Sequence, residues 1–236
     1  MINKLDKPSL SVIIPTLEEE ENINELVLRL ASTLDNSTKH YELIFVDDHS
    51  SDKTIIELTK LIDKFPIRIF EKVGKKGKSF SLIEGFKVAK YELIAMIDAD
   101  LQYPPEALTN MLKEIQYNNA DIVIARRDDY SKNSLRSFGT RITKNIYQYL
   151  FGFDYDVQSG LKLFRVEVLE HMNFDFVGPW TFDIAFLFQA IQSENTIRSV
   201  DIKFARRVYG SSKVNFLKVG SEILAYAIKI KFTKKT

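Results

Sequence analysis

Two aspartates close a short apolar run near the middle of the chain. The run begins at Tyr91, and Asp98, Asp100 and Gln102 follow it at alternate positions. If the backbone stays extended here, alternate side chains point the same way, so two carboxylates and one amide oxygen converge. Oxygen ligands of this kind suit Mg²⁺ or Mn²⁺, which can in turn grip a diphosphate. The stretch therefore predicts a metal site.

A second acidic pair, Asp47 and Asp48, closes an earlier apolar run that begins at Tyr41. The carboxyl ends of parallel strands share one edge of a sheet, and α/β proteins bind ligands at that edge. Taken alone, Asp100 could cap the helix that follows it and Asp98 could be a solvated strand end. Two acidic pairs on one edge are hard to attribute to helix capping alone.

Strands and helices must alternate to place these carboxylates. Short β-branched or apolar runs predict strands, and apolar residues at helical spacing predict helices. The expected strands lie at 10–15, 41–46, 67–70, 91–97 and 121–125, and the apolar faces of the helices between and after them span 23–34, 55–65, 82–89 and 108–115. Such an alternation is typical of an α/β fold with a mainly parallel, doubly wound sheet and right-handed crossovers.

The rhythm changes after Arg127. A helix-like run extends from Arg136 to Phe151, an apolar helix is expected from Phe182 to Ile191, and a strand from Ile197 to Phe204. No linker rich in proline, glycine or serine separates the halves. A chain of 236 residues that is 45% hydrophobic can fill one large core, so we expect one compact unit.

Composition excludes several kinds of chemistry. The chain has no cysteine, which rules out disulfides, thiolate metal ligands and a cysteine nucleophile, and favours a reducing compartment. The N-terminal residues lack the apolar region of a signal peptide, and no window offers 18 uncharged apolar residues. We therefore expect no membrane span in this sequence.

Basic charge gathers at the C-terminal end. Residues 201–236 hold nine lysine or arginine residues and two acidic ones, a net charge of +7, whereas residues 1–200 carry −6. From Phe216 to Thr236, apolar residues alternate with lysines, which is typical of a basic amphipathic helix that lies in a membrane interface. An ordinary packed terminal helix is the alternative. Nucleic acid is not an expected partner, because no aromatic stacking residues are interleaved with the basic ones.

Taken together, the motifs of this chain resemble the inverting family 2 glycosyltransferases of GT-A fold, a Rossmann-like α/β fold. They are most similar to the polyprenyl-phosphate branch, which includes dolichol-phosphate mannose and glucose synthases. The resemblance covers almost the whole chain and rests on VIIPTLEEEENI, ELIFVDDHSSDKT, GKKGKSFSLIEGF, IDADLQYPPE, DIVIARR, DVQSGLKLFR and RVYGSSK. Each motif alone is weak, but their order and spacing together are specific.

The resemblance implies a domain organisation and a reaction. Residues 1–215 would form the glycosyltransferase domain, with a nucleotide-sugar-binding half at 1–127 and an acceptor half at 128–215, followed by the amphipathic helix at 216–236. The enzyme would move a hexose from a UDP-glucose or GDP-mannose type of donor to a polyprenyl phosphate. It would need Mg²⁺ or Mn²⁺ and would lie at the cytoplasmic face of the membrane as a peripheral protein.

The resemblance also assigns site residues. The nucleotide and its phosphates would be bound by Pro15, Glu19, Asp47, Asp48 and Lys78; the metal by Asp98, Asp100 and Gln102; and the acceptor phosphate by Arg127, Arg136, Arg207 and Lys213. Arg136 is assigned by spacing alone, and a position on a solvated helix face is the alternative. Asp100, Arg127, Arg207 and Asp183 would be the catalytic set. The chain departs from the family at Leu17 and Glu18, where an aromatic residue and an asparagine are usual. Glu18, Glu20 and Glu21 are expected to form a solvated first helical turn.

The role expected for Asp183 depends on which of two kinds of acceptor the enzyme uses. A phosphate acceptor needs no strong general base, because its second pKa of about 6 leaves it largely dianionic at neutral pH. Asp183 would then orient the sugar or the acceptor. If the acceptor is instead a sugar hydroxyl of a surface glycan, Asp183 becomes an essential base. A nucleotide-sugar-binding module without turnover is a third alternative.

Overall fold

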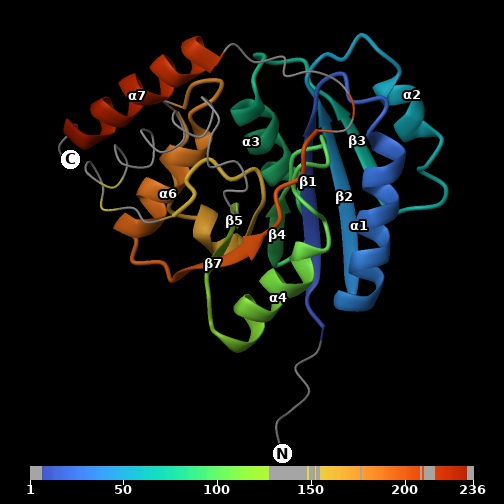
Figure 1. Cartoon of the computed structure of the whole chain (residues 1–236), viewed down its shortest axis with the longest axis horizontal. Helices are drawn as coiled ribbons and strands as arrows, with labels where there is room; N and C mark the ends of the chain where they lie inside the picture. Colours follow the sequence, from blue (N-terminus) through green and yellow to red (C-terminus); the bar gives the residue numbers. More distant parts are fainter. Residues whose placement is uncertain are drawn as a thin grey trace, which may run out of the picture.

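The computed structural model describes residues 7–127, 148, 152, 155–175, 177–207, 209 and 216–232. In this part of the chain the strands form one sheet (Figure 1). They are β1 (Ser9–Thr16), β2 (His40–Asp47), β3 (Ile67–Glu71), β4 (Leu93–Met96), β5 (Ile122–Arg127), β6 (Lys162–Arg165) and β7 (Ile197–Ile202). The helices are α1 (Ile23–Ser37), α2 (Thr54–Thr59), α3 (Lys78–Val88), α4 (Ala107–Tyr117), α6 (Phe182–Gln192) and α7 (Phe216–Phe232), with a 3-10 turn at Val166–Leu169. Apart from Gln148, the helix predicted from Arg136 to Phe151 lies outside the described residues.

The strand order is β3-β2-β1-β4-β6-β5-β7. β1 is parallel to both β2 and β4, so these three strands end at the same edge of the sheet. The predicted shared edge for the two acidic pairs is therefore confirmed. β6 is the exception, because it runs antiparallel between β4 and β5. The sequence did not predict this strand, since it is only four residues long and begins with a lysine.

Helices cover both faces of the sheet and make two apolar cores. α1, α2 and α4 pack on one face, where Leu26, Leu58 and Leu108 belong to the same buried cluster. α3, α6 and α7 pack on the other face, where Phe86 and Phe186 lie in the second cluster (Figure 1). This layered arrangement confirms the predicted α/β fold and leaves the carboxyl edge of the sheet for a site.

α7 has a buried side and an exposed apolar side. Ile223 and Ala227 are buried in the second core, whereas Leu224 and Ile228 are 40% and 46% exposed. The predicted C-terminal helix is thus present and packs on the domain. None of the helices described in the structure has the length and apolar character needed to cross a membrane.

The backbone turns sharply as it leaves each of the three central strands. Glu18, His49 and Leu101 follow β1, β2 and β4, and all have a positive φ, of 54°, 65° and 59°. This left-handed conformation is uncommon for residues other than glycine, and strained backbone of this kind tends to cluster at active sites. The backbone is therefore not extended through Gln102, which was the condition for alternate side chains to point the same way, because the chain turns at Ala99 and Asp100.

Candidate active site

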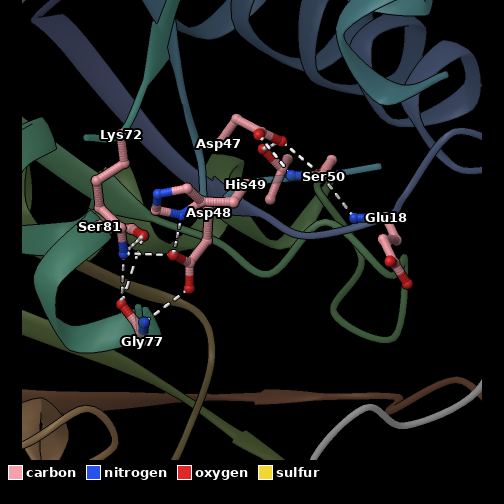
Figure 2. A network of polar contacts seen from close by, with 9 residues as sticks. Glu18, Asp47, Asp48, His49, Ser50, Lys72, Gly77 and Ser81 are labelled. Atoms are coloured by element: carbon pink, nitrogen blue, oxygen red, sulfur yellow. Dashed lines mark hydrogen bonds and ion pairs between the residues drawn. The ribbon is translucent and has the colours of Figure 1, made fainter. Parts of the chain in front are cut away.

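Asp47 organises the turn at the end of β2. Its carboxylate accepts hydrogen bonds from the backbone N–H of Ser50 (2.8 Å) and from the Ser50 hydroxyl (2.5 Å). The same serine Oγ accepts the backbone N–H of Glu18 at 2.8 Å (Figure 2). Pro15 lies next to Val46 in the register of β1 and β2. Asp47 and Pro15 are thus at the predicted edge, and Asp47 holds the β1 and β2 loops together.

The carboxylates of Glu18 and Glu20 brace this loop, whereas Glu21 is exposed in the turn before α1, as predicted. α1 begins only at Ile23. Glu18 accepts the Ser51 hydroxyl at 3.0 Å, and Glu20 accepts the backbone N–H of Lys53 at 2.8 Å. The prediction for these two glutamates is therefore wrong, since loop closure against residues 50–54 uses their carboxylates.

Glu19 lies within the same braced loop. Its backbone N–H donates to the Thr54 hydroxyl at 2.8 Å, and its carboxylate accepts the side-chain amide of Asn22 at 2.6 Å. Asn22 is 2% exposed, so this amide holds the glutamate from a fixed position. Glu19 is therefore fixed at the carboxyl end of β1, where the nucleotide pocket is predicted.

Asp48 joins β2 to β3 and α3. Its carboxylate pairs with the Lys72 ammonium at 2.7 Å and accepts the backbone N–H of Gly77 at 2.7 Å (Figure 2). Lys72, whose side chain is fully buried, also donates to the Gly77 carbonyl and the Ser81 hydroxyl. Burial acts to raise the pKa of Asp48, but the hydrogen bonds from Lys72 and Gly77 outweigh it and lower that pKa. The sequence did not identify Lys72.

A glycine brings the starts of α3 and α6 together. Gly77 has φ 135°, and a Cβ at this position would lie 2.6 Å from the Cβ of Pro179. The Ser79 backbone N–H donates to the Pro179 carbonyl (3.0 Å), and the Phe182 backbone N–H donates to the Ser79 hydroxyl (3.1 Å). Side chains from the first turns of both helices, Lys78 and Asp183, consequently meet at one place.

Lys78 forms an ion pair with Asp98. Burial opposes the charge on Lys78, but the carboxylates of Asp98 and Asp183 outweigh it and raise its pKa. Burial also raises the pKa of Asp98; Lys78 counteracts this effect and the charge of Asp100 adds to it. A Cβ on Gly160 would lie 2.1 Å from Asp98 Oδ2, so only glycine leaves room for this carboxylate.

Asp100 is buried and pairs with Arg207. The Nη2 to Oδ2 distance is 2.5 Å, and Asp100 Oδ1 accepts the backbone N–H of Gln102 at 3.1 Å. The Gln102 side-chain amide donates to the Ala205 carbonyl at 3.2 Å. Two segments that are about a hundred residues apart in sequence, 100–102 and 205–207, are therefore joined at the predicted metal site.

The carboxylates of Asp98 and Asp100 fit a metal ion whose remaining ligands come from a bound substrate and water. Asp98 and Asp100 interact electrostatically, and each carboxylate has a side-chain cation beside it. Among the described residues, no group of three or more histidine, aspartate or glutamate side chains is arranged to hold a metal alone. Mg²⁺ characteristically binds one or two carboxylates and completes its shell with substrate phosphates and water.

Asp183 is paired with a lysine from the middle of the sheet. Lys162, on β6, forms an ion pair with Asp183 Oδ1 and donates to the Ser159 carbonyl at 2.6 Å. The Lys162 side chain is fully buried. Burial lowers its pKa, and the Asp183 carboxylate opposes that shift. The sequence did not single out Lys162, although it lies in the DVQSGLKLFR motif.

Arg127 reaches the same cluster from β5. Its Nε and Nη2 atoms bind both oxygens of Asp156 at 2.6 and 2.7 Å, and its guanidinium lies 5.4 Å from the Phe204 ring centroid. The neighbouring Arg126 instead pairs with the exposed Asp201. The structure thus places Arg127 in the site and Arg126 outside it. Asp156 is a second residue of DVQSGLKLFR that the sequence did not identify.

The structure brings most of the predicted site residues to one edge. Those in contact or electrostatic interaction there are Lys78, Asp98, Asp100, Asp183 and Arg207. Arg127 is linked to them through Asp156, whose charge acts on Lys162. Pro15, Glu19, Asp47 and Asp48 line the neighbouring ends of β1 and β2. Arg136 and Lys213 lie outside the described residues. The assigned roles of all these residues stay predictions.

In sequence, the chain matches one family model and several known proteins. Residues 11–172 match the family model described as glycosyl transferase family 2. A dolichol-phosphate mannosyltransferase of Pyrococcus furiosus is 39% identical over 117 residues, which is 50% of this chain and 32% of that protein. An undecaprenyl-phosphate 4-deoxy-4-formamido-L-arabinose transferase of Edwardsiella ictaluri is 27% identical over 89% of this chain and 64% of its own length. The chain thus spans less than two thirds of these relatives.

A solved structure shares the fold. Glucosyl-3-phosphoglycerate synthase from Mycobacterium tuberculosis, in complex with Mn²⁺, UDP-glucose and phosphoglyceric acid, superposes with a TM-score of 0.78 at 16% identity. The match covers 97% of this chain and 81% of that one. At this identity the likeness establishes the fold alone, and it confirms the α/β, GT-A type of architecture.

Proposed function

Since this chain belongs to glycosyl transferase family 2, we propose that it transfers a hexose from a nucleotide diphosphate sugar to the phosphate of a polyprenyl phosphate. Named relatives act with dolichol phosphate and undecaprenyl phosphate, which supports an acceptor of this class. The donor would be of the UDP-glucose or GDP-mannose type. An oxygen of the acceptor phosphate attacks the anomeric carbon, the bond from that carbon to the diphosphate breaks, and the nucleoside diphosphate leaves.

The donor side needs positive charge where the diphosphate leaves. Asp98 and Asp100, with Gln102, would hold Mg²⁺ or Mn²⁺, which supplies positive charge to the leaving diphosphate. Lys78 contributes a further cation from the first turn of α3, where the helix N-terminus also favours phosphate. Pro15, Glu19, Asp47 and Asp48 would form the nucleoside pocket beside it.

The contact between Asp183 and Lys162 supports a phosphate acceptor over a hydroxyl. A general base must take up a proton, and a proton on Asp183 would remove the charge that the buried Lys162 ammonium pairs with. A phosphate dianion needs no base, only cations that hold it. Arg127 and Arg207 would bind it within the described site, together with Arg136 and Lys213.

Membrane attachment would follow from the same acceptor. The exposed Leu224 and Ile228 of α7, with the lysines of residues 216–236, would rest in the interface of an anionic membrane. On this proposal residues 1–215 are the catalytic domain, with donor and acceptor halves at 1–127 and 128–215. The enzyme would lie at the cytoplasmic face as a peripheral protein.

A matched pair of acceptors tests the proposal. The purified protein, with Mn²⁺ and a nucleotide sugar, is given either a polyprenyl phosphate or the corresponding polyprenol, and release of nucleoside diphosphate is measured. We expect the phosphate to stimulate release and the alcohol to leave it at the background rate. Equal stimulation by both, or stimulation by the alcohol alone, would show a hydroxyl acceptor and contradict the proposal.

A further inference from the structure

Lys162 is an unusual residue for the centre of a sheet. It lies on β6 directly opposite Met96 of β4 and Ile124 of β5, both of which are fully buried. Its own side chain is also fully buried. Burying an ammonium is energetically costly, and a paired buried charge is often no more stabilising than an apolar side chain of similar volume. Stability alone therefore does not account for a lysine here.

The contacts of Lys162 all hold it toward Asp183. Its ammonium binds the Ser159 carbonyl at 2.6 Å on one side and Asp183 Oδ1 on the other. Ser159 is itself fully buried, and its hydroxyl donates to the Leu161 carbonyl at 3.1 Å, which fixes the turn before β6. The Lys162 ammonium is thus held by the backbone of the turn before β6 and by one carboxylate, that of Asp183.

Asp183 lies between Lys162 and the donor site. It belongs to the first turn of α6, which is tied to the start of α3 through Ser79 and Phe182. Its side chain is 16% exposed, and its charge acts on Lys78 and Asp98. Oδ1 contacts Lys162, and within the described part of the chain Oδ2 has no hydrogen-bond partner, so Oδ2 is the oxygen available to a ligand at the donor site.

We propose that Lys162 is a positioning residue that fixes the Asp183 carboxylate as a hydrogen-bond acceptor for a hydroxyl of the donor's sugar. A sugar attached to a diphosphate at Lys78 and Asp98 lies next to Asp183, and an O–H donor binds an ionised carboxylate strongly. Lys162 holds that carboxylate in one orientation through their ion pair. The inference rests on the proposed function in taking the donor to be a nucleotide sugar.

Donor binding without any acceptor tests this role. Isothermal titration calorimetry in Mn²⁺ compares UDP with UDP-glucose, and GDP with GDP-mannose, for the wild type, Lys162→Met, Asp183→Asn and the double variant. We expect the wild type to bind one sugar nucleotide more tightly than its nucleotide. Lys162→Met should weaken the affinity for that sugar nucleotide about tenfold, the effect of losing one charged hydrogen bond. It should leave the affinity for the nucleotide unchanged.

The double variant shows whether Lys162 acts through Asp183. If it does, Asp183→Asn alone should cause the same loss, and Lys162→Met should add nothing in the Asp183→Asn background. The double variant carries neither buried charge, so it should fold even if Lys162→Met alone is unstable. Lys72→Met is the matched control for a buried lysine, since it lies on the nucleotide side and should weaken nucleotide and sugar nucleotide equally.

Three results would overturn the inference. These are an equal loss for nucleotide and sugar nucleotide in Lys162→Met, losses that multiply in the double variant, and a wild type that binds the two ligands equally well. Because no acceptor is present, failure of transfer to lipid would count against the proposed function and leave these comparisons intact.

Discussion

At the scale of single residues, the charges of the site come in opposed pairs. Lys78 faces Asp98, Arg207 faces Asp100, and Lys162 faces Asp183. In the structure, side-chain cations pair with the carboxylates that are predicted to hold the metal. A metal that binds there must compete with these cations, and Lys78 and Arg207 then become available to phosphate groups.

Replacing Lys78 tests this competition. We expect Lys78→Met to bind Mn²⁺ alone several-fold more tightly than the wild type, because the cation beside Asp98 is gone. The same variant should bind Mn²⁺ with UDP or GDP several-fold more weakly, because it lacks a phosphate contact. Electron paramagnetic resonance of Mn²⁺ measures both affinities. Arg126→Met, in an exposed ion pair, is the control and should bind like the wild type. If Lys78→Met instead bound Mn²⁺ more weakly both alone and with nucleotide, Lys78 would only help to build the metal site, and the competition would be contradicted.

At the scale of elements, the site depends on how loops join the ends of strands and helices. Asp48 connects β2, β3 and α3, while Gly77 allows the start of α3 to pack against the turn before α6. Neither contact lies within a helix or a strand pair. The sheet supplies the edge, and these loop contacts decide which side chains meet there.

Gly77 is expected to be the sensitive glycine of its loop. Gly77→Ala should lower the free energy of unfolding by about 3 kcal/mol, because its φ is positive and its Cβ would overlap Pro179. Gly74→Ala is the matched control, since its Cβ would approach only the end of the Glu84 side chain at 3.2 Å; we expect a change below about 0.5 kcal/mol. Urea denaturation measures both, and equal effects would contradict the packing argument.

The contribution of Asp48 to the free energy of unfolding should depend on pH. Asp48→Asn leaves the buried Lys72 without a counter-charge, so we expect a loss of about 3 kcal/mol in the free energy of unfolding at pH 7. The folded-state pKa of Asp48 is lowered, so its contribution is fully present above the unfolded pKa of about 3.9 and is lost as pH falls through the lower folded value. Denaturation curves should show the difference intact at pH 5 and smaller below about pH 4. A difference that already shrinks between pH 7 and 5 would contradict this assignment.

The sequence was informative about elements and less so about their partners. Apolar runs ending in Asp47 and Asp98 placed both acidic pairs at one edge, because parallel strands must share an edge. Lys162 and the short strand β6 escaped prediction, since a buried lysine interrupts the apolar pattern by which strands are recognised. Pairs such as Asp100 with Arg207 are long-range contacts, and spacing along the chain carries no signal of them.

At the scale of the whole molecule, the proposal assigns the substrates to the carboxyl edge of the sheet and the membrane to α7. The edge gathers the residues predicted to hold the donor, and the exposed side of α7 offers an apolar stripe within the basic C-terminal region. A lipid-borne acceptor would bring its phosphate to the edge while its chain stays in the membrane. Contact between α7 and the membrane is the part of this proposal that can be tested without catalysis.

Vesicle sedimentation tests that contact. The double variant Leu224→Ser and Ile228→Ser should bind vesicles of anionic lipid at least tenfold more weakly, because buried apolar area drives interfacial binding. Since both side chains are exposed, the melting temperature should change little. Leu28→Ser, on the exposed side of α1 and across the sheet from α7, is the control and should bind like the wild type. Unchanged binding of the double variant would exclude α7 as the membrane contact.

Transfer of labelled sugar into lipid tests the central claim most directly. The wild type and Asp100→Ala are incubated with a polyprenyl phosphate, Mg²⁺ or Mn²⁺, and a panel of radiolabelled UDP- and GDP-sugars, and the label in the organic phase is counted. We expect label from one donor with the wild type, none after addition of EDTA, and a loss of at least a hundredfold in a folded Asp100→Ala. Full activity of Asp100→Ala, or of the wild type in EDTA, would contradict the metal site, and no label in lipid from any donor would contradict the proposed transfer.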